Sequence, residues 1–284
     1  MMSQLSLTVL VDNTTLTDHY FMGEPGLSFI LETKGKKILF DAGYSDAFLA
    51  NAGKMGINLR DLDYVVLSHG HRDHSGGLVP LVSYMTDAQI NTIPFKVPDL
   101  IAHPRSFYPR PKFPLPNIGS VLSEAEVQRQ FKVNLSEKPL WITENLVFLG
   151  EIPRKFSFER TDPGTRKIVL TDGSTEPDLL LDDSALAFRS DEGLVVITGC
   201  SHAGICNITE YAREVCGERK VVDIIGGLHL LSPGPERMQE TGTYLQDLHL
   251  KALHACHCTS LLAKLALARY CPVSEVGSGM KLEW

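Results

Sequence analysis

The stretch SHGHRDHSGG, residues 68–77, gathers four side chains that can ligate a metal ion. They are His69, His71, Asp73 and His74. Imidazole and carboxylate groups suit zinc, iron and manganese. Alternate residues of an extended segment point the same way, so His69 and His71 can reach one ion. The following turn directs Asp73 and His74 toward a second point, and the loop thereby predicts two adjacent metal ions, as in two-metal hydrolytic sites.

A two-metal site needs more ligands than one loop supplies, and three later segments offer them. TGCSHAG carries Cys200 and His202, IGGLHL carries His229, and HACHCT carries His257. Each segment follows or forms an expected strand end, so all of them can meet at one edge of a sheet, where sites in α/β proteins collect. We expect His202 and His257 to be ligands, and His229 to be either a ligand or a substrate-binding group.

Hydrophobic patterning indicates a layered α/β protein. Two halves of the chain each show strands followed by helices, which predicts an α/β sandwich forming a single domain over residues 1–284. One helix is expected after Gly76-Gly77 and another behind a capping box formed by Ser123 and Glu126. A third is expected to be capped by Asn207 with Glu210.

Residues 94–119 differ in kind, because they include seven prolines. This content excludes both a continuous helix and a central strand. Long irregular segments in compact domains are usually lids or binding loops, so we expect an insert that covers a substrate, the alternative being a solvated surface excursion. The candidate substrate contacts in it are His103, Tyr108, Arg110 and Lys112, which can stack a ring and hold a phosphate.

Composition narrows the classes of partner. The net charge is −7 without a long basic run, so a nucleic-acid partner is not expected. No apolar run approaches the length of a membrane span, and the N-terminal residues lack the features of a signal peptide, so a cytoplasmic location is expected. All six cysteines follow residue 199 and none forms a Cys-x-x-Cys pair, which argues against a disulfide framework. A homodimer is the default expectation for the assembly.

These motifs together resemble those of the metallo-β-lactamase superfamily. HGHRDH fits its His-x-His-x-Asp-His signature, and KKILFDAG resembles its strand ending in Leu-Phe-Asp-x-Gly, where Asp41 would orient ligands. LGEIPRKFSFE, TGCSHAGICNI, GGLHL and HCTS resemble one branch, named for 7,8-dihydropterin-6-methyl-4-(β-D-ribofuranosyl)aminobenzene-5′-phosphate synthase. The resemblance implies a four-layer αββα sandwich with the metals between its two sheets. It also implies one ion held by His69, His71 and His202, and the other by Asp73, His74 and His257.

The chain departs from the superfamily pattern in three places. A bridging Asp is common after a Thr-Gly pair, but Thr198-Gly199 is followed by Cys200. Cys200 is then either a thiolate ligand, or the second site is weaker or empty. Pro25 stands where this branch is expected to have His, and Ser260 where Gly is common, so both are candidates for altering substrate specificity.

Two catalytic functions and one redox function are compatible with these residues. The first is a hydrolase with two divalent ions, zinc before iron or manganese, whose metal-bound hydroxide attacks an ester or phosphoester of a small molecule. Asp73 would be a ligand that orients the nucleophile, and His229 would be a hydrogen-bond donor or proton carrier. The alternative is a transferase joining a dihydropterin to an aminobenzene ribose phosphate. An iron-dependent redox or thiol-handling domain is the third and least favoured.

Overall fold

Two mixed β-sheets lie face to face in the computed structural model, which describes residues 4–112, 114–115, 117–160 and 162–284. The first sheet has seven strands in the order β15-β1-β2-β3-β4-β5-β6. Their bounds are β1 (Leu5–Val11), β2 (Ser28–Thr33), β3 (Lys36–Phe40), β4 (Tyr64–Val66), β5 (Asp99–Ala102), β6 (Lys132–Leu135) and β15 (Lys281–Glu283).

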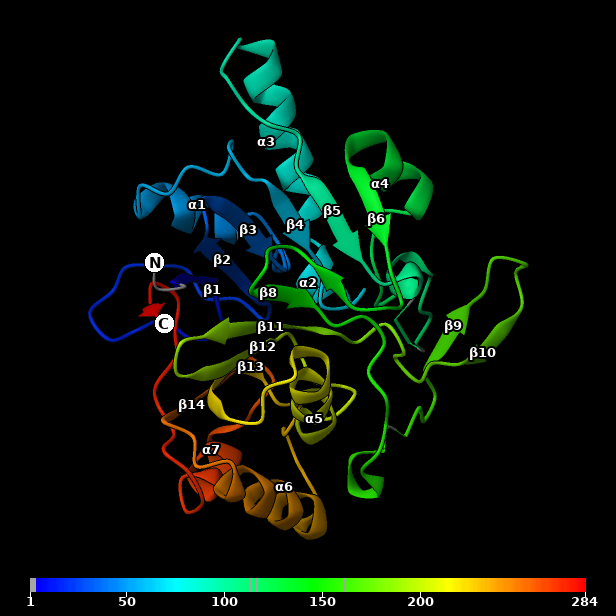
Figure 1. Ribbon diagram of the computed structural model, residues 1–284. Coiled ribbons are helices and arrows are strands. Elements are labelled where there is room, and N and C mark those ends of the chain that lie inside the picture. The colour runs from blue at the N-terminus through cyan, green and yellow to red at the C-terminus, as the bar shows by residue number, and fades with distance from the viewer. Residues whose placement is uncertain (1–3, 113, 116, 161) are drawn as a thin grey trace.

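The second sheet has six strands in the order β14-β13-β12-β11-β8-β7. Their bounds are β7 (Leu140–Trp141), β8 (Leu146–Phe148), β11 (Ala185–Ser190), β12 (Gly193–Thr198), β13 (Val221–Gly227) and β14 (Ala252–Cys256). A separate hairpin of β9 (Lys167–Val169) and β10 (Thr175–Pro177) projects from one side of the molecule (Figure 1).

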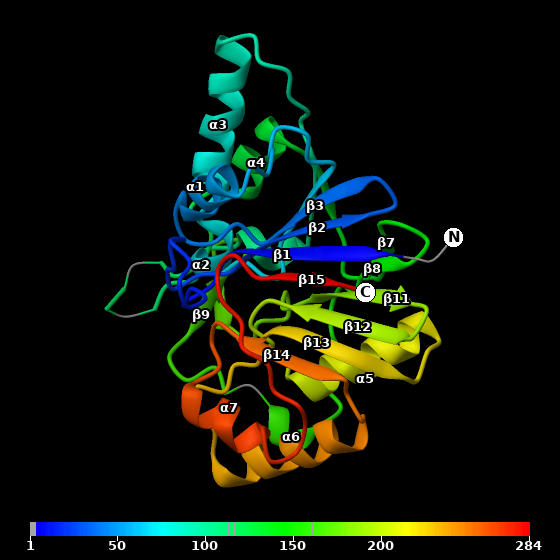
Figure 2. The same cartoon turned by 90° about the vertical axis from the view of Figure 1, so that its left-hand side faces the viewer.

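Helices cover the outer face of each sheet, which completes the four-layer αββα sandwich expected from the sequence (Figures 1 and 2). The first sheet is covered by α1 (Ala47–Lys54), α3 (Leu78–Ile90) and α4 (Glu124–Gln130). The second is covered by α5 (Ile205–Cys216), α6 (Pro235–Asp247) and α7 (Leu261–Leu267). Short helical turns occur at α2 (Arg72–Ser75), η1 (Pro104–Phe107) and η2 (Ser157–Glu159). No helix in the described ranges is long and apolar enough to cross a membrane.

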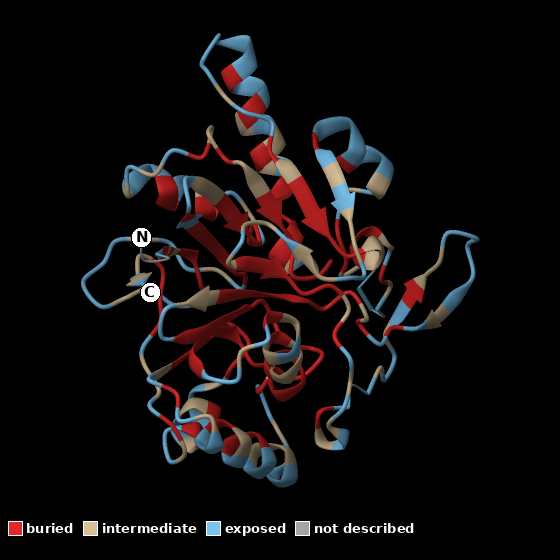
Figure 3. Ribbon diagram, in the orientation of Figure 1, coloured by how far each residue is buried: buried red, intermediate tan, exposed pale blue. Residues whose placement is uncertain are grey.

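Three apolar cores separate the four layers, and Figure 3 shows the resulting band of buried strands. The central core lies between the sheets and includes Phe29, Phe40, Phe148 and Phe188, all fully buried. Burial of large aromatic side chains supplies much of the free energy that holds such sheets together.

The parallel strands set the location of the site. β3 and β4 are parallel in the first sheet, and β12, β13 and β14 are parallel in the second. β1 runs the same way as β3, because both are antiparallel to β2. The loops after these carboxyl ends therefore carry residues to one edge of the sandwich.

Two expectations about elements are wrong. β5 lies inside the proline-rich segment and pairs with both β4 and β6, so this segment does contain an interior strand. Pro98 and Pro104 flank the strand without interrupting it, so no ladder N–H is lost. Residues 113 and 116 of this segment lie outside the described residues.

The helix expected to begin at Asn207 begins at Ile205 instead. Glu159, distant in sequence, accepts hydrogen bonds from the backbone N–H groups of Cys206 and Asn207, and so caps α5. The Asn207 side chain accepts from Lys155 and Phe156 and ties their loop to the helix. The capping box of Ser123 and Glu126 is present at α4 as expected.

Candidate metal centre

Seven candidate ligands meet at the common edge of the two sheets. His69 and His71 follow β4, and α2 adds Asp73 and His74. Loops after β12 and β14 supply the remaining three, Cys200, His202 and His257. Ligand atoms of these residues form two groups, within each of which all the atoms lie within 4.8 Å of one another.

The first group contains three imidazoles. His71 Nδ1 lies 3.0 Å from His69 Nε2 and 3.2 Å from His202 Nε2. Burial and the surrounding histidines lower the pKa of both His69 and His202 well below the ordinary value. Burial and the charge of Arg110 lower the pKa of His71 to about 3. The three rings are therefore neutral and can offer lone pairs to a cation.

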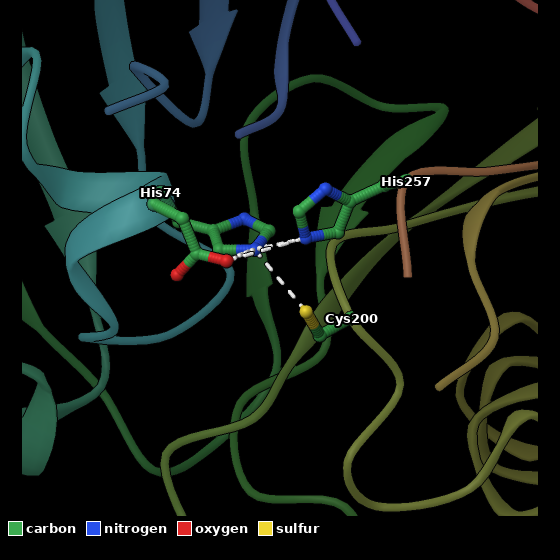
Figure 4. Close-up of side chains that lie close together, drawn as sticks. His74, Cys200 and His257 are labelled. Atoms are coloured by element: carbon green, nitrogen blue, oxygen red, sulfur yellow. Dashed lines mark hydrogen bonds and ion pairs between the residues drawn. The ribbon is translucent and has the colours of Figure 1, made fainter. Parts of the chain in front are cut away.

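The second group contains Asp73, His74, Cys200 and His257. Figure 4 shows three of these side chains converging: His74 Nε2 lies 3.2 Å from Cys200 Sγ and 3.1 Å from His257 Nε2. Asp73 Oδ2 lies 3.4 Å from His257 Nε2. The two groups are adjacent, because the ring centroids of His69 and His74 are 4.3 Å apart. Cys200 thus lies with the second group.

Hydrogen bonds behind the rings fix which nitrogens face the centre of the second group. Asp41, fully buried after β3, accepts from His74 Nδ1 at 2.7 Å, and Asn13 Oδ1 accepts from His257 Nδ1 at 2.9 Å. Both partners are acceptors, so each ring carries a proton on Nδ1 and directs Nε2 inward. Two Nε2 atoms that face each other at 3.1 Å need a cation between them, which is either a proton or a metal ion.

His69 is oriented by the same carboxylate through a serine. The Ser68 hydroxyl donates to Asp41 Oδ2 at 2.7 Å and lies 2.9 Å from His69 Nδ1. Since the hydroxyl proton is used on Asp41, Ser68 Oγ accepts from His69 Nδ1, and Nε2 of His69 faces the first group. The donor set and its orientation fit two divalent ions, with imidazole in both groups and a thiol and a carboxylate in the second.

Strained backbone accompanies the site. Asp41, Ser201, His229 and His257 all have positive φ values, from 49° to 57°, which non-glycine residues seldom adopt. Each lies within a few residues of a strand's carboxyl end. Such conformations cost about 1–3 kcal/mol each and persist where the surroundings hold a functional geometry. Four of the nine described non-glycine residues with positive φ lie at this edge, as expected where surrounding groups hold a ligand geometry.

Two adjacent aspartates, which the sequence analysis did not identify, support the ligand loops. Asp182 accepts from the backbone N–H of Gly70 at 2.8 Å, and Asp183 accepts from that of Ala203 at 2.8 Å. Burial raises the pKa of Asp183 to about 7. Asp182 also forms an ion pair with Arg110 at 2.7 Å. One short segment thus holds the loops of both groups.

Several expected substrate contacts do not face the site. Arg110 is fully buried and paired with Asp178 and Asp182, so it supports the loops and does not contact substrate. His103 is also fully buried, and its Nδ1 accepts from the Arg105 N–H. Tyr108 is half-buried outside the cleft lining. The hydroxyl of Ser260 caps α7, which gives it a structural role.

An open cleft of about 330 Å³ lies over the two groups. This volume is in the range of small-molecule sites. His229 lines the cleft with its ring centroid 4.3 Å from that of His202, outside both groups. Its backbone N–H donates to Cys258 Sγ, another residue that the sequence analysis left unassigned. The cleft is also lined by Asn13, Pro25, Lys112, Ile118, Arg166 and Leu231.

Comparison with known proteins agrees with this geometry. Residues 22–213 match the metallo-beta-lactamase superfamily. A protein of Methanocaldococcus jannaschii, named 7,8-dihydropterin-6-methyl-4-(beta-D-ribofuranosyl)-aminobenzene-5'-phosphate synthase, is 32% identical over 89% of this chain and 90% of its own length.

Solved structures show the same fold over the whole chain. A metal-dependent hydrolase of the β-lactamase superfamily superimposes with a TM-score of 0.81 and 28% identity over 98% of both chains. A diphosphatase of the PhnP family gives a TM-score of 0.54 with 15% identity, covering 100% of this chain and 98% of its own, and shows the fold alone. On its sequence match, its αββα architecture and its histidine-rich edge, the chain belongs to the metallo-β-lactamase superfamily.

Proposed function

We propose that this protein is a metal-dependent hydrolase that cleaves an ester or phosphoester of a small molecule. The observation that carries the proposal is the pair of inward-facing donor groups beneath an open cleft. His69, His71 and His202 would hold one ion, and Asp73, His74, Cys200 and His257 the other. Zinc suits this set best, because a thiolate is a soft ligand and imidazole is compatible with zinc.

Two bound divalent ions would supply Lewis acidity and lower the pKa of coordinated water toward about 7. The protein's own groups would then orient the reactants. Burial raises the pKa of the Asp73 carboxyl, but His74 and His257 lower it further, so its pKa lies well below the ordinary value. Asp73 is therefore an anion at neutral pH, and it can accept a hydrogen bond from the attacking water.

His229 is the group we assign to the substrate side of the reaction. Burial and the charges of Arg237 and Arg166 lower the pKa of His229 to about 4, so its ring is neutral at pH 7. A neutral imidazole in the cleft can donate one N–H to the oxygen on which negative charge develops.

A transferase of the kind named for the Methanocaldococcus relative is the second candidate, supported by 32% identity over most of the chain. A pterin would call for an aromatic surface in the cleft. Of the described lining residues, the apolar ones are Pro25, Ile118 and Leu231, and Tyr108 is not among them. Hydrolysis is placed first because a metal-dependent hydrolase of the same superfamily superimposes over 98% of both chains with a TM-score of 0.81.

Elemental analysis of the purified protein, prepared without chelator, tests the metal centre. We expect about two ions per chain in the wild type, as in two-metal sites. We expect about one ion in Cys200→Ala, because this variant lacks one ligand of the second group. Cys271→Ala, a buried cysteine outside the site, is the matched control and should retain both ions. Absence of tightly bound metal in the wild type would overturn the proposal.

Hydrolysis of 4-nitrophenyl carboxylic esters and phosphodiesters tests the reaction class. We expect release of nitrophenolate that is lost with chelator and restored by zinc. A fully metallated protein that cleaves none of these compounds, but condenses a dihydropterin diphosphate with an aminobenzene ribose phosphate, would establish the transferase instead.

A further inference from the structure

Lys112 and Arg166 are cations on the rim of the cleft in a chain whose net charge is −7. Within the described residues, neither has a carboxylate partner within ion-pair distance. Arg166 donates from Nη2 to the backbone oxygen of Asp162 at 2.7 Å, and its buried Nε has no hydrogen-bond partner in the described part of the chain. Its charge also lowers the pKa of His202 and His229, which places it within electrostatic reach of the cleft floor.

Two arginines in the same proline-rich segment as Lys112 are, in contrast, paired with carboxylates. The neighbouring Arg105 pairs with Glu176 at 2.5 Å, and Arg110 pairs with Asp178 at 3.1 Å. Arg105 and Arg110 are thus neutralised, whereas Lys112 and Arg166, which line the cleft, are not. A cation kept free of carboxylates at such a position is available to an anionic ligand.

The loops that carry the two cations are held together, so the pair is set before a ligand binds. The Val169 N–H donates to the Pro109 oxygen at 2.9 Å and joins the two segments, and the Asp178 N–H donates to the Arg166 oxygen at 3.1 Å within the second segment. The buried Arg110–Asp178 ion pair joins the loops from within. Arg166 and Lys112 both lie close in sequence to these connections. Positioning cations in advance reduces the entropy lost on binding.

We infer that Arg166 and Lys112 form an anion subsite on the cleft rim, and that the substrate carries a phosphate group separate from the bond that is cleaved. This inference rests on the hydrolase function proposed above. A phosphate dianion matches two cations, one a planar guanidinium that donates in pairs and the other a mobile point charge. The reacting group belongs beside the candidate ligands and His229, which follow the parallel strands, whereas both cations come from the proline-rich segment and the segment that leads into β9.

Two substrates that differ only in a remote phosphate test the subsite with the metal-loaded protein. They are thymidine 5′-(4-nitrophenyl phosphate) and its 3′-phosphorylated form. We expect the kcat/KM of the wild type to be about tenfold higher for the 3′-phosphorylated compound, because its KM is lower. A tenfold effect is what one charge-assisted hydrogen bond contributes. Arg166→Gln should bring the ratio close to one, and Lys112→Gln should reduce it in part. Lys167→Gln, an exposed neighbour outside the cleft lining, should retain the full preference.

Equal kcat/KM for the two compounds in the wild type, or a preference that survives Arg166→Gln, would overturn the inference. If neither compound is cleaved, the hydrolase proposal fails for phosphodiesters, but the subsite is still decided by calorimetry. Tighter binding of thymidine 3′,5′-bisphosphate than of thymidine 5′-phosphate, lost in Arg166→Gln, would support it. Equal binding of the two nucleotides would refute it.

Discussion

The carboxylate of Asp182 accepts a 2.8 Å hydrogen bond from the backbone N–H of Gly70, the residue between His69 and His71. The same carboxylate lies 2.7 Å from Nη2 of Arg110, which is itself fully buried. The loop that carries His69 and His71 is therefore held by the buried ion pair between Asp182 and Arg110. A Cβ at Gly70 would collide with the Ser106 oxygen, so only glycine fits between the two histidines.

We expect Asp182→Asn to lower the free energy of unfolding by about 3 kcal/mol, because it removes one of the two carboxylates, Asp178 and Asp182, that compensate the buried charge of Arg110. Urea unfolding followed by circular dichroism measures the change. Asp172→Asn, on the exposed turn between β9 and β10, is the matched control and should stay within about 0.5 kcal/mol of the wild type. If Asp182→Asn is as stable as the control variant, Asp178 alone is enough to compensate the buried charge of Arg110.

The contribution of Asp182 to stability should also depend on pH. Burial raises its pKa, but Arg110 and the Gly70 N–H lower it further, so the folded-state pKa lies below the ordinary value. A depressed carboxyl pKa gives stability that is present above the unfolded pKa of about 4 and lost as pH falls through the folded pKa. In that window the unfolded chain binds the proton and the folded chain does not.

Urea unfolding of wild type and Asp182→Asn at pH 7, 5 and 3 checks this sign. Both proteins are compared with chelator present, so that metal release does not enter the difference. We expect the difference in unfolding free energy to be largest at pH 7 and to shrink toward pH 3. A difference that stays constant with pH would show that the variant acts through packing and not through the charge of Asp182.

Asp41 is expected to govern metal affinity. It accepts from His74 Nδ1, from the Ser68 hydroxyl and from the Ser68 N–H, so it orients two candidate ligands in different groups. Changing such an orienting group typically reduces metal affinity about 10–100-fold. Asp41→Asn should therefore lose zinc to a competing chelator at lower chelator concentration than the wild type. Asp46→Asn, exposed at the start of α1, should behave as the wild type.

Local sequence patterns were sufficient for most strands and for the parts of the site that lie at strand ends. His202 and His257 follow apolar runs, and parallel strands bring such positions to one edge regardless of loop details. β5 was missed because the prolines were assessed over the whole segment, whereas Pro98 and Pro104 lie just outside four residues of strand. Flanking prolines do not remove ladder donors.

The supporting residues were missed for a different reason. Asp182-Asp183 in LLLDDSA has the composition of a solvated turn, and only the tertiary fold places these carboxylates against Gly70 and Ala203. Likewise, Asn207 and Glu210 have the spacing of a cap, but Glu159 takes that role from another part of the chain. Contacts between distant loops leave no periodic signal in the sequence.

A variant of His229 distinguishes a role in catalysis from a role in metal binding. Its ring lines the cleft beside His202 but belongs to neither donor group, so His229→Ala should retain the metal content of the wild type. Removing one hydrogen-bond donor to the developing charge typically reduces kcat about 10²–10³-fold. We therefore expect a loss of that size on the best 4-nitrophenyl ester, with KM changed less. Steady-state kinetics and elemental analysis on the same preparation check both parts, and His249→Ala, outside the site, is the control. Loss of metal in parallel with activity would make His229 a ligand, which is the role that the sequence alone left open.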